Sequence, residues 1–116
     1  MASLKVTITN TANGPFNVWT LFQGGTIAGA TLAPTTPIVP SAPSSSLIVQ
    51  ADPSNGGTNV YYGDADIGTS GPGEVLQAGS SLTKPLSPTW SIAASTLAKG
   101  YIQTSANGAI VNLEVS

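Results

Sequence analysis

Turn residues interrupt this chain so often that little room is left for helices of ordinary length. Short apolar and β-branched runs alternate with clusters of Gly, Pro, Asn and Asp, at a spacing of roughly ten residues. The pattern is clearest between residues 46 and 95, where turns separate four apolar runs: 46–51, 59–63, 74–82 and 90–95. We predict β-strand structure in each of these runs, with a turn at Ala78-Gly79 inside the run 74–82, and an all-β protein.

The two ends of the chain repeat this pattern with a two-residue period. In residues 4–8 and 109–115 apolar side chains alternate with polar or charged ones, which is typical of half-buried strands. We predict further strands at 16–22 and 26–32. We also predict one at 101–104, joined to the last strand as a hairpin by Asn107-Gly108, and a short helical turn at 95–99. The expected fold is a β-sandwich or jelly-roll-like barrel of about eight short antiparallel strands.

A proline-rich segment, residues 33–45, divides the N-terminal strands from the main set. Its four prolines, Pro34, Pro37, Pro40 and Pro43, exclude a helix and favour a stiff, extended backbone. Two interpretations are open: a connector between two groups of strands, which we favour, or an arm that reaches a neighbouring subunit. The length of 116 residues fits a single domain, residues 1–116.

Charged residues are scarce: only 7% of the chain is Asp, Glu, Lys or Arg, and the formal net charge is −2. A typical domain carries about 25%, so we expect a partner to cover much of the surface. Three separated lysines do not supply the phosphate contacts that nucleic-acid binding requires. The N-terminus lacks a signal-peptide layout and no apolar run approaches the length of a bilayer span. We therefore predict no nucleic-acid partner and no membrane association.

The composition also restricts catalysis, because the chain contains no His and no Cys. Asp52 precedes a proline in a turn, so we expect it to cap its own backbone, and Glu114 should point to solvent. Asp64, Asp66 and Glu74 can approach one another around a glycine-rich loop. We predict structural or solvent-facing roles for this trio, with a calcium site or a two-carboxylate hydrolase as alternatives. The sequence predicts no catalytic residue, no metal and no cofactor.

The few aromatic residues are candidates for binding. Trp90 lies in an apolar run and we expect it in the core, whereas Trp19 and Tyr61 are expected on a face away from it. Together with Tyr62, such residues stack on sugar rings or anchor a protein interface. Ordinary packing is the alternative, since aromatic side chains dominate cores as well.

The stretch from residue 46 to residue 95 resembles small β-rich structural proteins of tailed bacteriophages. The similarity lies in an apolar strand, an Asn/Gly turn, the Asn-Val-Tyr-Tyr-Gly-Asp segment, a glycine-rich loop, a Leu-Gln-Ala-Gly-Ser turn and a Trp-Ser-Ile-Ala-Ala segment. These occupy residues 46–51, 55–57, 59–64, 68–73, 76–80 and 90–94, about half of the chain. The resemblance implies a decoration or cement protein on the capsid exterior, often trimeric and without catalytic residues.

From this resemblance we expect a non-enzymatic virion protein, made in the host cytoplasm, that binds the major capsid protein and itself. The alternative is a carbohydrate- or receptor-binding module of a fibre, tail or adaptor. We expect the partner surface to use the proline-rich segment, exposed aromatic residues and the glycine-rich loop. The candidate interface residues are Trp19, Phe22, Pro34, Pro37, Pro40, Pro43, Tyr61, Asp64 and Asp66.

Overall fold

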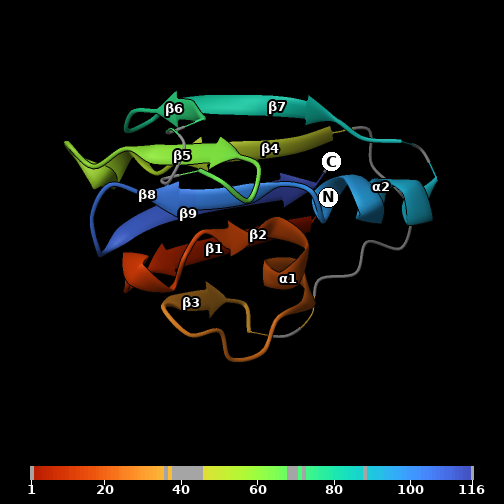
Figure 1. Cartoon of the computed structure of the whole chain (residues 1–116), viewed down its shortest axis with the longest axis horizontal. Helices are drawn as coiled ribbons and strands as arrows, with labels where there is room; N and C mark the ends of the chain where they lie inside the picture. Colours follow the sequence, from red (N-terminus) through yellow and green to blue (C-terminus); the bar gives the residue numbers. More distant parts are fainter. Residues whose placement is uncertain are drawn as a thin grey trace.

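The protein is a sandwich of two antiparallel β-sheets (Figure 1), and the prediction of an all-β fold is confirmed. The computed structural model describes residues 2–35, 37, 46–67, 71, 73–87 and 89–115. Nine strands are present in these residues, close to the eight expected. They are β1 (Ala2–Ile8), β2 (Phe16–Asn17), β3 (Ala30–Ala33), β4 (Ser46–Ala51), β5 (Val60–Gly63), β6 (Glu74–Leu76), β7 (Ser81–Pro85), β8 (Tyr101–Thr104) and β9 (Ala109–Val115).

The larger sheet has the strand order β3-β1-β9-β4-β7, and the smaller sheet has the order β2-β8-β5-β6. The first and last strands of the chain are therefore neighbours at the centre of the larger sheet, with Ala2 opposite Val115. The two chain ends lie close together in Figure 1. β3 and β4, on either side of the proline-rich segment, belong to the same sheet with β1 and β9 between them.

The core lies between the sheets and is built from the alternating positions that the sequence predicts. In β9 every second residue, from Ala109 to Val115, is buried, and β4 alternates in the same way around Leu47 and Val49. Burying each such aliphatic side chain contributes about 1.5–3 kcal/mol of transfer free energy. This apolar layer holds the two sheets together.

A short helix, α1 (Val18–Gln23), replaces most of the strand predicted at residues 16–22, so that prediction is wrong beyond β2. Asn17 caps the helix, because its side-chain oxygen accepts a hydrogen bond from the Thr20 amide at 3.0 Å. Val18, Leu21 and Phe22 are all buried. Their i, i+3, i+4 spacing is helical, and the apparent alternation of the segment concealed it.

A second helix, α2 (Trp90–Leu97), lies where the sequence predicts a strand at residues 90–95 and a helical turn at 95–99. The strand prediction is wrong. Ala93 and Leu97, four residues apart, are buried, whereas Ile92 is 56% exposed. Ala93, Ala94 and Leu97 favour a helix, and burial of one helical face overrides the β-propensity of Ile92.

The predicted C-terminal hairpin is also wrong, because β8 and β9 belong to different sheets. The Asn107-Gly108 turn carries the chain from one sheet to the other. The Gly108 amide donates to the Ile8 carbonyl at 2.6 Å, and the Asn107 side chain accepts from the Thr11 amide at 2.9 Å. These bonds tie the turn to the end of β1, so the strand that follows pairs with β1 instead of β8. The strand predicted at 26–32 is also shorter than expected and begins later in the chain, since β3 covers Ala30–Ala33.

Both outer edges of the larger sheet are protected against further strand pairing. The loop before β3 runs along the outer edge of that strand. Two hydrogen bonds hold it there: the Ala30 amide donates to the Ile27 carbonyl, and the Gly25 amide donates to the Thr35 carbonyl. At the other edge, β7 contains Lys84 and ends at Pro85. Charged residues and prolines are common protective features of edge strands.

Candidate functional site

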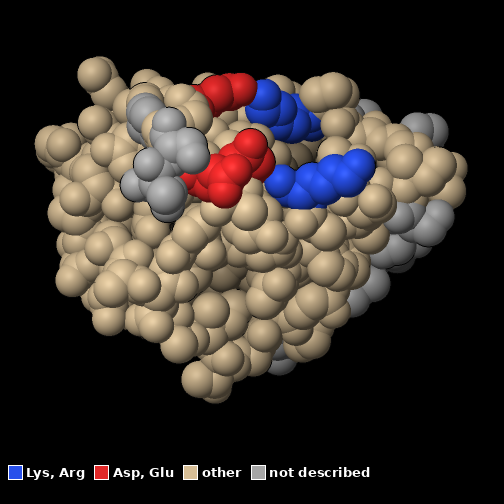
Figure 2. Space-filling view, in the orientation of Figure 1, with Lys and Arg blue, Asp and Glu red and all other residues tan. Residues whose placement is uncertain are grey.

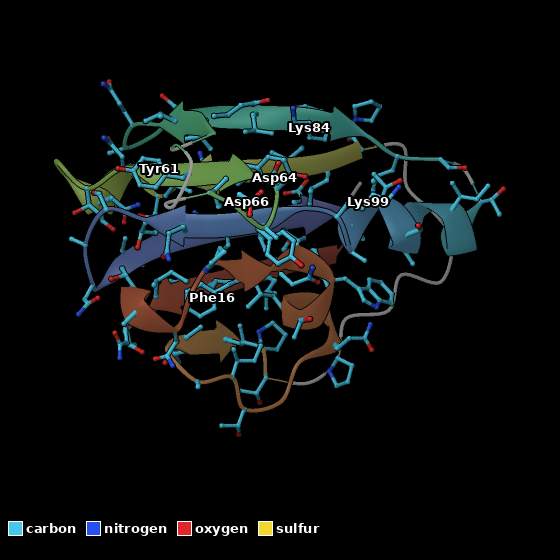
Figure 3. All side chains as sticks on the ribbon, viewed as in Figure 1. Phe16, Tyr61, Asp64, Asp66, Lys84 and Lys99 are labelled. Atoms are coloured by element: carbon cyan, nitrogen blue, oxygen red, sulfur yellow. The ribbon has the colours of Figure 1, made fainter. Side chains whose placement is uncertain are left out.

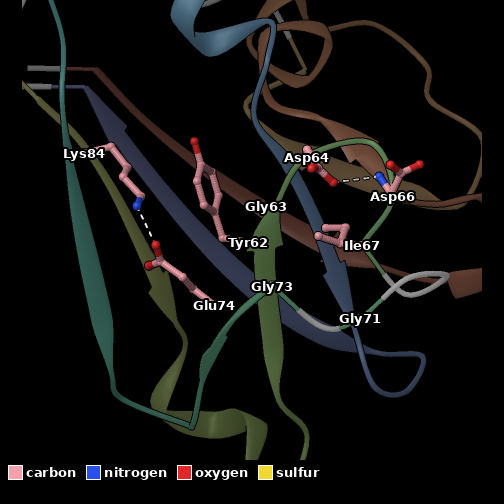
Figure 4. Close-up of a pocket in the computed structure, with 9 residues that line it drawn as sticks. All are labelled: Tyr62, Gly63, Asp64, Asp66, Ile67, Gly71, Gly73, Glu74 and Lys84. Atoms are coloured by element: carbon pink, nitrogen blue, oxygen red, sulfur yellow. Dashed lines mark hydrogen bonds and ion pairs between the residues drawn. The ribbon is translucent and has the colours of Figure 1, made fainter.

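A hollow in the described part of the molecule lies beside the β6–β7 edge of the sandwich. It has a volume of about 460 Å³. Figure 4 shows Tyr62 standing between the Glu74–Lys84 pair on one side and Asp64 and Asp66 on the other. Ile67 and the glycines at 63, 71 and 73 complete its wall. The structure thus brings together the three carboxylates that the sequence singled out, and adds Lys84 and Tyr62, which the sequence did not connect with them.

Glu74 and Lys84 form an ion pair of 2.5 Å between the two sheets. Lys84 lies opposite Leu47 in the larger sheet, and Leu47 faces the core, so Lys84 points inward. Glu74 lies opposite Tyr62, which in turn lies opposite the buried Ile102, so Glu74 also points inward. The ion pair therefore joins the two sheets where their edge strands β6 and β7 face each other, a place that apolar side chains would otherwise fill.

Tyr62 forms the wall between the two charged groups of the pocket. Burial raises the pKa of its phenol, and the neighbouring charges of Lys84 and Glu74 act in opposite directions on it. The Lys84 ammonium lies 5.7 Å from the centre of the Tyr62 ring, within range of a cation–π contact. Gly100 leaves room for the phenol, since a side chain there would collide with the Tyr62 oxygen. Tyr62 is therefore a fixed element of the edge.

Asp64 and Asp66 are exposed and belong to the turn after β5. An Asp64 carboxylate oxygen accepts a hydrogen bond from the Asp66 amide at 3.0 Å, which is a turn-capping role. No group of three or more His, Cys, Asp or Glu residues within the described ranges is arranged to hold a metal ion. Since Glu74 is engaged by Lys84, the geometry gives no support to the calcium or two-carboxylate alternatives.

A second polar cluster lies on the outer face of the larger sheet. Asp52 accepts hydrogen bonds from the Ser54 hydroxyl at 2.7 Å, the Asn112 amide group at 2.9 Å and the Ser54 backbone amide at 2.9 Å. These bonds stabilise the carboxylate and lower its pKa from 3.8 to about 2, with Lys5 contributing less. The predicted capping role of Asp52 is thus present, and it extends across the sheet to β9.

The predicted interface aromatics lie in three different environments. Phe22 is 1% exposed and belongs to the core, so we correct its assignment as an interface residue. Trp19 is half-buried in α1 and packs against the core. Tyr61 is half-buried on the outer face of the smaller sheet, opposite Val75, which is 47% exposed. Because Tyr61 and Tyr62 are consecutive in β5, they point to opposite faces and form no common stacking platform.

Of the predicted proline contacts, Pro34 and Pro37 are exposed, whereas Pro40 and Pro43 lie outside the described residues. The side chain of Trp90, expected in the core, is also outside what the structure describes.

The distribution of charge shows a surface that the sequence prediction missed. No Asp, Glu, Lys or Arg occurs in residues 6–51, and this run without charge can be read directly from the sequence. In Figure 2 the visible charged side chains gather in the upper part, where Figure 3 places Asp64, Asp66, Lys84 and Lys99. The region over β2, α1 and β3 shows none. Apart from Ala33, which is set aside because it lies opposite Lys5, its exposed residues are small or uncharged: Thr9, Asn10, Ala12, Asn13, Thr20, Gln23, Gly25, Thr26, Ala28, Thr31, Pro34 and Thr35. We call these residues the uncharged surface.

No protein-family model matches the chain, and comparisons with curated proteins and with solved structures return no match. Within the described ranges, neither helix has the length and apolar character needed to cross a bilayer.

Proposed function

We propose that this protein is a non-enzymatic structural component of a virion, a decoration or cement protein that binds the outer surface of a capsid shell. The partner in this proposal is the major capsid protein. The proposal includes self-association, as a trimer, because the resemblance of residues 46–95 to phage structural proteins implies it. It rests on that resemblance together with the surface properties of the folded chain.

The observation that carries the proposal is the uncharged surface. Cores of protein interfaces are depleted in charged residues, because a charge that loses its water there must be paired to avoid a large cost. Ala, Gly and Pro lose no side-chain entropy on contact, and Thr and Asn lose less than Lys, Arg or Glu. A surface of this composition, backed by a packed sandwich, is suited to docking on another protein with little reorganisation.

The proposed mechanism is mechanical. Each contact between one copy and the shell is weak, and many symmetric copies bridge neighbouring capsid subunits. Linking several contacts in one assembly raises the overall avidity without a new contact. The protected edges of the larger sheet favour attachment through surfaces and loops over strand addition to those edges.

Sedimentation of the purified protein, alone and with purified empty shells of tailed bacteriophages, tests the proposal. We expect a stable trimer in solution and co-sedimentation with a subset of shells. A strict monomer that remains in the supernatant with every shell would contradict it.

Charged substitutions locate the surface in the same experiment. Thr26→Glu and Thr31→Glu each place a charge on the uncharged surface and should reduce co-sedimentation at least about tenfold, because a charge at an interface is left without a partner. Thr83→Glu is the matched control, since Thr83 is exposed in β7, outside that surface. All three variants should retain the far-ultraviolet circular dichroism spectrum of the parent protein. Equal loss with Thr83→Glu would argue against this location.

A further inference from the structure

The chain contains three Asn-Gly dipeptides, at residues 13–14, 55–56 and 107–108. In such a pair the amide nitrogen of glycine attacks the side-chain carbonyl carbon of asparagine. Glycine is the most reactive following residue, because it has no side chain to obstruct the attack. The three sites have equal local sequence chemistry, so any difference between their rates in the folded protein must come from structure.

Asn55 is protected at its side chain. Its oxygen accepts from the Ile110 amide at 2.8 Å, and its nitrogen donates to the Ile110 carbonyl at 2.8 Å. This two-point bond fixes the carboxamide against the central strand β9. Reaction requires the side chain to leave β9 first.

Asn107 is protected through its neighbour and its own oxygen. The Gly108 amide, which would be the nucleophile, donates to the Ile8 carbonyl at 2.6 Å. The Asn107 oxygen accepts from the Thr11 amide at 2.9 Å. Freeing this glycine requires the end of the β1–β9 pairing to open, which separates segments remote in sequence.

At Asn13 the two groups that must react carry fewer bonds than at the other two sites. It ends the 3₁₀ turn η1 (Thr11–Asn13), and its exposed carboxamide makes no hydrogen bond within the described residues. The Gly14 amide donates to the Thr11 carbonyl at 3.0 Å, inside the same turn. That carbonyl also accepts from the Gln103 side chain at 3.0 Å, so two donors share one acceptor. Thr11 anchors the turn to Gln103 and Asn107, but the Gly14 amide itself is freed by breaking one bond inside the turn, with both anchors left in place.

We propose that Asn13 is the first residue of the folded protein to deamidate. The Gly14 nitrogen gives up its proton and bonds to the side-chain carbonyl carbon of Asn13, and the bond from that carbon to the side-chain nitrogen breaks. Ammonia leaves, and a succinimide ring remains. Water then adds to either ring carbonyl and opens the ring, giving aspartate or isoaspartate. The product places a negative charge within the uncharged surface, at a turn whose Asn13 side chain packs over Gly29.

Peptide mapping by mass spectrometry after incubation at mildly alkaline pH tests this assignment. In the folded protein we expect Asn13 to convert at least about tenfold faster than Asn55 and Asn107, because tertiary opening is rarer than local opening. In concentrated denaturant the three rates should become similar, which supplies the internal control. Asn13→Gln should remove the fast phase and leave the other two rates unchanged.

Two results would overturn the assignment: equal rates at the three sites in the folded protein, or conversion first at Asn55 or Asn107. Neither result depends on capsid binding, so this inference and the proposed function succeed or fail separately.

Discussion

Asp52 is the residue whose charge the fold uses most directly. Three hydrogen bonds to its carboxylate join the turn η2 (Pro53–Asn55) to Asn112 in β9. A carboxylate stabilised in this way binds its proton less readily in the folded protein than in the unfolded chain. Its contribution to stability is therefore complete above the unfolded pKa of 3.8 and is lost as the pH falls toward the folded value of about 2.

We expect Asp52→Asn to remove this part of the acid sensitivity. Between pH 3.8 and about 2 the free energy of unfolding of the parent protein should fall more steeply than that of the variant. Urea unfolding at a series of pH values measures both curves. Glu114→Gln is the control, because it removes a carboxylate that makes no hydrogen bond within the described residues. Parallel curves for the parent and Asp52→Asn would show that Asp52 has no such role.

At the scale of the element, α1 depends on one side chain at its start. Asn17 accepts from the Thr20 amide and also donates to the Ala98 carbonyl at 2.7 Å, which joins α1 to the end of α2. Asn17→Ala removes both bonds and should cost about 2 kcal/mol of stability. Asn17→Asp keeps the cap and loses only the donor, so it should cost less.

Chemical denaturation of the two Asn17 variants measures this difference. Asn10→Ala is the comparison, since Asn10 caps only η1 through the Ala12 amide. If Asn17→Ala costs no more than Asn10→Ala, the link between the two helices contributes nothing measurable.

The β6–β7 edge combines two inward-pointing charges. An exposed ion pair of this kind contributes at most about 1 kcal/mol. Its larger effect is to prevent an apolar edge from pairing with another chain. We expect the double variant Glu74→Leu/Lys84→Leu to remain folded and to associate at concentrations where the parent protein does not aggregate.

Light scattering against protein concentration measures this association. Thr83→Leu is the matched control on the same strand, because Thr83 lies opposite Ile48 on the outward face and not between the two sheets. A double variant that scatters no more than the parent would show that the charges do not protect the edge.

For the molecule as a whole, the sequence predicted the all-β class and the strands with clean alternation, above all β1, β4 and β9. It failed where two periods compete. Residues 16–22 alternate and also place Val18, Leu21 and Phe22 on one helical face, and only packing between the sheets selects the helix. The Asn107-Gly108 turn is correctly recognised as a turn, but its partner strand is chosen by hydrogen bonds to Ile8 and Thr11, which are remote in sequence.

The candidate site was predictable only in part. The sequence singled out Asp64, Asp66 and Glu74 as neighbours around one loop. It gave no indication that Lys84 would meet Glu74, because that contact depends on which strand lies at the edge of each sheet. The uncharged surface, by contrast, corresponds to a run without charge in residues 6–51. The sequence lacks only the information that these residues lie together on one side of the folded protein.

The position of β9 has a consequence for the order of folding. The strand that separates β1 from β4 in the larger sheet is formed by residues 109–115, so the sheet has no centre until this segment is available. On a ribosome, β1, β3 and β4 leave the exit tunnel long before the strand that joins them. Pairing β1 with β9 closes a loop of nearly the whole chain, which is slow because its entropy must be lost before the contacts form. We therefore expect the larger sheet to form only once residues 109–115 have left the tunnel, and not strand by strand as the preceding residues emerge.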